Sequence, residues 1–242
     1  MKIMVITPHT DDMVYGTAGT LLTHSEDEKH IIAITSIQRS AAEEVAAALG
    51  SSIQFLDAGY KQIGCEVDRL RPRLLEIIVA MMPDYILAPP ASGDWSPDHV
   101  ATGRLALEAA AESGILGNWG ARFLRYPIPA TTLEFQANLW IDLPVELIER
   151  KIELAAIMTR GAEDIWPHEV VEWEMDTQIR FAHELGWPSK HAEGFDALFK
   201  VPFKRLPPRN QSLAHLHKTH RDIVRTLQQG ATIRKGQSSL NK

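Results

Sequence analysis

An imidazole and two adjacent carboxylates follow the first apolar segment of the chain. Residues 3–6 read Ile-Met-Val-Ile, which is typical of a buried parallel strand, and His9, Asp11 and Asp12 come shortly after it. In open α/β sheets the residues just past the carboxyl ends of strands line the ligand-binding crevice. Because histidine and aspartate are common zinc ligands, the pattern predicts a metal site after the first strand.

A further ligand of the same kind follows another strand-like segment. Residues 85–88 read Tyr-Ile-Leu-Ala, and a polar loop leads from them to His99. One aspartate and two histidines leave the fourth position of a zinc ion open for water, as a hydrolytic zinc site requires. We expect His9, Asp12 and His99 to hold the metal, and Asp11 to take a proton from the water.

Each of these residues also has a purely structural interpretation. His9, Asp11 and Asp12 suit the start of a helix, where a side chain can cap free N–H groups and acids favour the helix dipole. His99 taken alone suits a solvated first helical turn. The two clusters together favour metal ligation.

The chain resembles the LmbE-like or PIG-L-type deacetylases, which remove acetyl groups from N-acetylglucosaminyl compounds. Members typically carry a His-Pro-Asp-Asp-Glu motif and a later His-Pro-Asp-His. Here these motifs read His-Thr-Asp-Asp-Met at 9–13 and Ser-Pro-Asp-His at 96–99. The resemblance extends to an Ala-rich segment ending in Leu-Gly at 41–50 and to Ala-Glu-Gly-Phe at 192–195.

This resemblance implies a zinc-dependent hydrolase that removes an N-acetyl group from an N-acetylglucosaminyl-type substrate. It implies zinc (Zn2+) bound by His9, Asp12 and His99, with Asp11 as general base. It also places Arg39 where substrate-binding basic groups of the family tend to fall. A surface ion pair of Arg39 with Glu43 is the structural alternative.

Two positions depart from the family's pattern. Ser96 stands where the family usually has a histidine that is thought to stabilise the oxyanion or protonate the leaving amine. A serine hydroxyl can still donate a hydrogen bond to an oxyanion, and protonated Asp11 or His191 is a candidate for the missing acid. Met13 replaces a glutamate near the metal loop, which predicts a metal affinity below the family norm.

Asp98 completes the expected catalytic set. It precedes His99 directly, so we expect it either to orient that imidazole or to cap the helix that begins nearby.

Three other functions are compatible with parts of the sequence. One is a related zinc amidase that cuts a larger amide, such as a thiol conjugate. Another is a non-catalytic carbohydrate-binding member that has lost the acid. A nucleotide-binding Rossmann protein is disfavoured, because no Gly-x-Gly-x-x-Gly follows the first strand.

Strand-like and helix-like segments alternate along the chain, which predicts an α/β, Rossmann-like three-layer sandwich with a mostly parallel sheet and helices on both faces. The stretch from Gly16 to Leu22 is expected to form a tight turn that opens the first helix. The expected strands are 3–6, 31–34, 53–56, 85–88, 123–126 and 139–142, and the expected helices are 17–24, 40–49, 67–82, 98–113 and 144–158.

The 242 residues, 45% of them hydrophobic, suffice for one substantial core. We expect a deacetylase domain at 1–200, followed at 201–242 by a basic tether and helix that pack on this domain or on a neighbouring subunit. Residues 200–242 hold ten Lys or Arg and one acid, whereas the rest of the chain holds 15 Lys or Arg and 30 Asp or Glu. An acidic body repels phosphate, which disfavours nucleic acid as a partner.

No apolar stretch approaches the ~20 residues that span a bilayer, and the first residues lack the pattern of a signal sequence. We therefore expect a cytoplasmic enzyme with a small amino-sugar substrate and no membrane partner, and leave a homo-oligomer open. The single cysteine, Cys65, cannot form an intrachain disulfide and is interpreted as a loop thiol.

Overall fold

The computed structural model describes most of the first 160 residues and one later strand. The chain divides into two compact units, Met1–Leu206 and Pro207–Lys242. The described residues all belong to the first unit and are 1–114, 121–128, 131–133, 135, 137–160 and 192–197.

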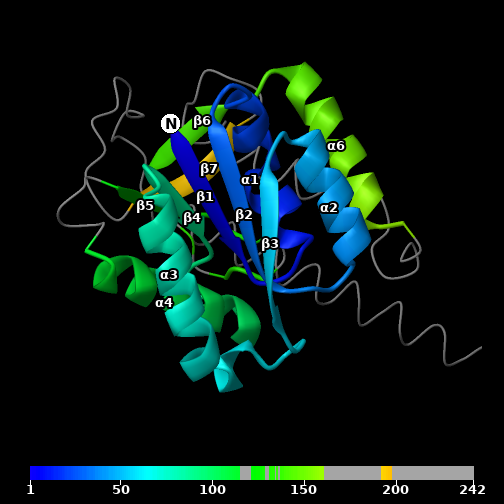
Figure 1. Cartoon of the computed structure of the whole chain (residues 1–242). Coiled ribbons are helices and arrows are strands. Elements are labelled where there is room, and N and C mark those ends of the chain that lie inside the picture. The colour runs from blue at the N-terminus through cyan, green and yellow to red at the C-terminus, as the bar shows by residue number, and fades with distance from the viewer. Residues whose placement is uncertain (115–120, 129–130, 134, 136, 161–191, 198–242) are drawn as a thin grey trace, which may run out of the picture. The chain divides into compact units, whose positions relative to one another are not determined.

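A seven-stranded sheet forms the centre of this unit (Figure 1). Its strands are β1 (Lys2–Thr7), β2 (Glu28–Thr35), β3 (Ser52–Ala58), β4 (Tyr85–Ala88), β5 (Arg122–Arg125), β6 (Leu139–Asp142) and β7 (Ala192–Ala197). Their order is β3-β2-β1-β4-β5-β7-β6. The first five strands pair in parallel, β7 runs antiparallel to β5, and β6 runs antiparallel to β7.

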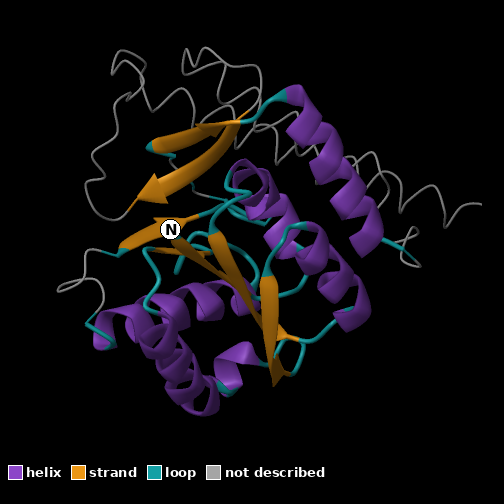
Figure 2. Ribbon diagram, turned by 45° about the horizontal axis from the view of Figure 1, so that its top comes forward, coloured by secondary structure: helices purple, strands orange, loops and turns teal. Residues whose placement is uncertain are grey.

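Helices cover both faces of the sheet, which confirms the predicted three-layer sandwich (Figure 2). One face carries α1 (Asp12–Thr23), α2 (Arg39–Ala48) and α6 (Val145–Met158), and the other carries α3 (Val67–Met81) and α4 (Pro97–Glu112). A short 3-10 turn, η1 (Ile63–Cys65), precedes α3. Cys65 is a free, exposed thiol at the end of this turn.

The packing of β1 explains why its residues 3–6 are all apolar. Ile3 and Val5 belong to the core on the α1 face, whereas Met4 and Ile6 belong to the core on the α3 face. Successive side chains of a strand point to opposite faces, so a central strand with helices on both sides needs an uninterrupted apolar run.

The predicted tight turn at Gly16 to Leu22 is wrong, because these residues lie inside α1, which begins at Asp12. A Cβ on Gly16 would lie only 2.2 Å from Cδ2 of Tyr126, so this glycine allows a ring to approach the helix. The strand β7 was not predicted, since its sequence Ala-Glu-Gly-Phe-Asp-Ala lacks an apolar run.

Among the described residues, no helix has the length and hydrophobicity of a membrane span. The predicted basic tether and helix at 201–242, and His191, lie outside the described residues.

Candidate metal centre

Two loops bring the predicted ligands together at one edge of the sheet. His9 follows β1 by two residues, Asp12 opens α1, and His99 lies in the first turn of α4, which follows β4. Because β1 and β4 are neighbouring parallel strands, their carboxyl ends meet at the same edge. The backbone N–H of His9 also donates to Oδ2 of Asp12 at 3.1 Å, which closes the loop between the first two ligands.

Three ligand atoms form a nearly equilateral triangle. Nδ1 of His9 lies 3.2 Å from Oδ2 of Asp12 and 3.3 Å from Nε2 of His99, and the latter nitrogen lies 3.5 Å from Oδ2 of Asp12. A tetrahedral zinc ion with bonds of about 2.0–2.1 Å separates its ligands by about 3.3–3.5 Å. The three side chains therefore fit a tetrahedral metal ion with one position left for water or substrate.

Asp98 fixes the ring of His9. Its Oδ2 lies 3.1 Å from Nε2 of His9 and also accepts the backbone N–H of Lys61 at 2.7 Å, and its Oδ1 accepts the N–H of Ile63 at 3.3 Å. The side chain is only 3% exposed. The sequence placed Asp98 beside His99 or at a helix cap, but its carboxylate faces the imidazole from the other loop.

Asp94 orients the ring of His99 in the same way, a role that was not predicted from the sequence. Its Oδ1 lies 3.2 Å from Nδ1 of His99, which is also 3.1 Å from Oγ1 of Thr131. The Asp94 carboxylate further accepts the hydroxyls of Thr131 and Thr132, each at 2.9 Å. The only signal in the sequence was an acid in the polar loop after β4.

These carboxylates determine which nitrogen of each ring is available to a metal. A carboxylate accepts the N–H on one side of an imidazole and leaves the lone pair of the other nitrogen for the metal. Nδ1 of His9 and Nε2 of His99 are the nitrogens left, and both face Asp12. Burial raises the pKa of Asp94, but hydrogen bonds from His99 and from the N–H of Ser96 outweigh this and lower it.

The site also perturbs the protonation of His9 and Asp11. Burial lowers the pKa of His9, but the hydrogen bond and charge of Asp12, with Asp98 and Asp11, outweigh it and raise the pKa to about 9. Burial and the neighbouring Asp12 carboxylate raise the pKa of Asp11 to about 6. A carboxyl group with such a pKa can both accept and return a proton near neutral pH.

Asp11, Met13 and Ser96 lie at the starts of the two helices that carry Asp12 and His99. Asp11 is the N-cap residue of α1 and Ser96 that of α4, and neither side chain makes a capping hydrogen bond. Met13 is fully buried in the core on the α1 face. The side chain of Met13 therefore contributes to the hydrophobic core.

Arg39 pairs with Asp57 instead of Glu43. Its guanidinium is 2.5 Å from Oδ1 of Asp57 and lies 4.0 Å from the centre of the Phe55 ring. Arg39 is the first residue of α2 and Asp57 lies near the end of β3, so both stand at the same edge of the sheet as the centre.

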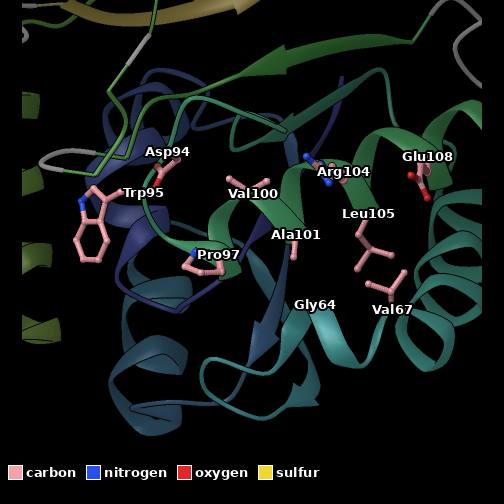
Figure 3. A pocket seen from close by; sticks show the side chains of 10 residues that line it. All are labelled: Gly64, Val67, Asp94, Trp95, Pro97, Val100, Ala101, Arg104, Leu105 and Glu108. Carbon is pink, nitrogen blue, oxygen red and sulfur yellow. The ribbon is translucent and has the colours of Figure 1, made fainter.

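A cavity of about 400 Å³ adjoins the centre along one face of α4. Asp94, which contacts His99, lines it together with Trp95, with residues of α4 such as Arg104, and with residues of η1 and the start of α3 (Figure 3). The three ligand residues do not line this cavity, so it neighbours the centre without containing it.

Comparisons with known proteins agree with this architecture. Residues 4–110 match the family model described as PIG-L: GlcNAc-PI de-N-acetylase. No curated protein matches the chain at a significant level.

Several solved structures share the fold. An N,N'-diacetylchitobiose deacetylase from Pyrococcus horikoshii has a TM-score of 0.67 and 22% identity, covering 84% of this chain and 87% of that one. The 4-carboxy-2-hydroxymuconate hydratase GalB from Pseudomonas putida has a TM-score of 0.65 and 16% identity, covering 85% and 99%. The zinc inhibited form of teicoplanin deacetylase Orf2 has a TM-score of 0.64 and 11% identity, covering 81% and 97%.

Proposed function

We propose, from the premise that residues 4–110 belong to the PIG-L family, that this chain is a zinc-dependent hydrolase that removes an acetyl group from an N-acetylated amino sugar. The observation that carries the proposal is the triangle of His9, Asp12 and His99, whose sides of 3.2–3.5 Å suit a tetrahedral metal ion. Two histidines and one aspartate are a ligand set that zinc favours.

A zinc ion held by these three residues supplies a Lewis acid that polarises the amide carbonyl and makes water more acidic. The other roles fall to the chain itself. Asp98 and Asp94 hold the two imidazoles in the orientation that ligation requires. In this proposal Arg39 and the hydroxyl of Ser96 contact the substrate at the edge of the site.

Asp11 provides both proton transfers. It accepts a proton from the water that attacks the acetyl carbon, which gives a tetrahedral carbon and a protonated carboxyl group. When the C–N bond breaks, Asp11 returns that proton to the departing nitrogen, so the products are acetate and a free amine. Its pKa of about 6 suits both directions of transfer.

Ser96 stabilises the oxygen of the tetrahedral carbon by donating a hydrogen bond. The hydroxyl makes no capping bond to α4, so it is not committed to the helix that it precedes. Removing a donor of this kind costs about 10²–10³ in rate in other enzymes.

The complete ligand triangle and its two supporting carboxylates favour an enzyme over a carbohydrate-binding protein without activity. The main alternative is a larger amide as substrate. The same catalytic groups could cleave it, and the shape of the pocket would decide which of the two substrates binds. The cytoplasmic location and the small amino-sugar partner stay predictions from the sequence.

The test combines zinc content with product formation. Purified protein, Asp11→Asn, His99→Ala and the control Asp68→Asn would be assayed for zinc and for acetate release from N-acetylglucosamine, N,N'-diacetylchitobiose and a larger amide. We expect about one zinc per wild-type chain, its loss in His99→Ala, and retained zinc with an activity loss of about 10²–10⁴-fold in Asp11→Asn.

The control probes an exposed acid in the first turn of α3 and should match the wild type. Zinc binding without cleavage of any amide would refute the deacetylase proposal. Cleavage of only the larger amide would assign the chain to the amidases.

A further inference from the structure

A tight turn after β3 presents an aromatic side chain beside the metal centre. Residues 59–62 form this turn, which is closed by a hydrogen bond of 3.0 Å from the N–H of Gln62 to the carbonyl of Gly59. Tyr60 and Lys61 occupy its two central positions. The turn lies at the carboxyl end of β3, the edge of the sheet that also holds the ligand residues.

The backbone of this turn adopts an uncommon conformation. Lys61 has a φ of 61°, in the left-handed region, and Tyr60 is not among the residues with positive φ. A positive φ at the second central position is the signature of a type II turn, where glycine or asparagine is usual. Lysine seldom adopts this conformation, and non-glycine residues with positive φ are concentrated at functional sites.

Two carboxylates hold the turn in place. The N–H of Lys61 donates to Oδ2 of Asp98 at 2.7 Å, and the N–H of Gly59 donates to Oε1 of Glu66 at 2.9 Å. The same Asp98 oxygen lies 3.1 Å from Nε2 of His9. The position of the turn is therefore tied to the orientation of a metal ligand.

The ring of Tyr60 is exposed to solvent and contacts the imidazole of His9. Its ring centre lies 5.3 Å from that of His9 with a tilt of 60°, and the side chain is 57% exposed. Nζ of Lys61 lies 5.2 Å from the same ring. By contrast Phe123, Tyr126 and Phe195 are fully buried, so Tyr60 contributes little to the core.

We propose that Tyr60 is a substrate-binding residue whose ring stacks on the apolar C–H face of the sugar of an N-acetylated amino sugar. This inference rests on the proposed function. When the acetyl group lies at the metal, the sugar carbon that is bonded to the amide nitrogen lies close to it. The sugar ring then lies next to the metal ligands, one of which, His9, contacts Tyr60. Tyrosine suits this role because its ring offers a large, rigid contact surface.

The experiment measures binding apart from cleavage. Zinc-loaded protein carrying Asp11→Asn would be titrated with N,N'-diacetylchitobiose by calorimetry, alone and combined with Tyr60→Ala, Tyr60→Phe or the control Val79→Ala. Val79 is an exposed apolar residue near the end of α3, at the opposite edge of the sheet. Zinc content would be measured for every variant.

We expect Tyr60→Ala to weaken binding about threefold to tenfold at unchanged zinc content, with Tyr60→Phe and Val79→Ala matching the parent. In the active protein Tyr60→Ala should raise KM for the disaccharide and leave kcat unchanged. An acyclic N-acetyl amine should be cleaved equally by wild type and Tyr60→Ala.

Unchanged disaccharide binding in Tyr60→Ala, or no disaccharide binding by the zinc-loaded parent, would overturn the inference. A loss of kcat in Tyr60→Phe with an altered alkaline limb of the pH profile would also overturn it, since the phenol would then act as an acid. Disaccharide binding that depends on Tyr60 without any acetate release by wild type would refute the proposed function and leave the inference supported.

Discussion

Asp98 lies against His9, which comes from the other loop of the site, and not against its sequence neighbour His99. Its Oδ2 is 3.1 Å from Nε2 of His9 and 2.7 Å from the backbone nitrogen of Lys61. One buried carboxylate therefore fixes both a candidate metal ligand and the turn that carries Tyr60. Supporting acids of this kind raise the basicity of the ligand and set its orientation.

Asp98→Asn should weaken zinc binding about 10- to 100-fold, because the amide lacks the charge that supports His9. Competition with a chromogenic chelator would measure the affinity. Asp68→Asn is the matched control, since Asp68 also lies in the first turn of a helix but is exposed. Equal affinity in Asp98→Asn and wild type would contradict the assigned role.

Zinc affinity should rise with pH between about 7 and 9. Without metal the pKa of His9 is raised to about 9, so the ring is protonated at neutral pH and must lose a proton before it can bind zinc. The affinity should therefore increase about tenfold per pH unit and level off above about 9. Calorimetry in buffers of different ionisation enthalpy would count the released protons, and the absence of proton release at pH 7 would contradict this prediction.

Ser96→Ala should lower kcat for acetate release by about 10²–10³-fold and leave zinc binding unchanged, because an oxyanion donor acts only in the transition state. Steady-state kinetics with a zinc assay would test it. Ser113→Ala, at the other end of α4, is the control. Wild-type kcat in Ser96→Ala would show that the oxygen is stabilised by other groups.

The sequence could indicate that the three candidate ligands lie together because their positions follow from chain order. His9, Asp12 and His99 come just after apolar segments that had to be central strands, and parallel strands align their carboxyl ends. Asp94 and Tyr60 could not be predicted in the same way. Their roles depend on loop conformations that place Asp94 on His99 and turn Tyr60 toward His9.

Contacts between distant segments also account for two errors in the predicted fold. Gly16 and Gly19 were predicted to form a turn, but they lie within α1. Their lack of a side chain lets Tyr126 and Glu193, from distant segments, approach the helix closely. The strand β7 was missed because Glu193 is buried through polar contacts, which hydrophobic patterning does not register.

Glu193 and Lys151 form a buried ion pair inside the molecule, with side chains 1% and 4% exposed and 2.5 Å between Oε1 and Nζ. Glu193 also accepts the backbone N–H groups of Gly19 and Thr20, at 2.9 and 2.8 Å. Lys151 donates to the carbonyl of Tyr15, which is the usual partner of the Gly19 N–H in an α-helix. The pair thus binds polar groups in the middle of α1.

Glu193→Gln should lower the free energy of unfolding by about 3–5 kcal/mol, because it leaves the Lys151 ammonium buried without a countercharge. Glu193→Gln with Lys151→Met should cost less than the sum of the single changes, since the double variant removes both charges. Urea unfolding of the four proteins gives the coupling energy.

Arg150→Ala provides the comparison from the same helix. Its pair with Glu153 is exposed, so the expected loss is at most about 1 kcal/mol. Additive effects of Glu193→Gln and Lys151→Met would argue against a coupled buried pair.

Gly16→Ala should destabilise the protein although alanine favours helices. The gain in helix propensity is at most about 1 kcal/mol, whereas overpacking a core costs about 1–3 kcal/mol. The new Cβ would lie 2.2 and 2.7 Å from ring atoms of Tyr126. That ring cannot move aside easily, because it is fully buried and its hydroxyl donates to the carbonyl of Ile6 at 3.0 Å.

Gly64→Ala is the matched control for this prediction, since the nearest atom to its new Cβ is 3.8 Å away. Thermal unfolding should show a lower Tm for Gly16→Ala and a Tm close to wild type for Gly64→Ala. Tyr126→Leu should relieve part of the overpacking, so the double variant with Gly16→Ala should lose less stability than the two single losses combined. A Tm for Gly16→Ala at or above the wild-type value would mean that helix propensity outweighs packing here, and that α1 and Tyr126 can separate without cost.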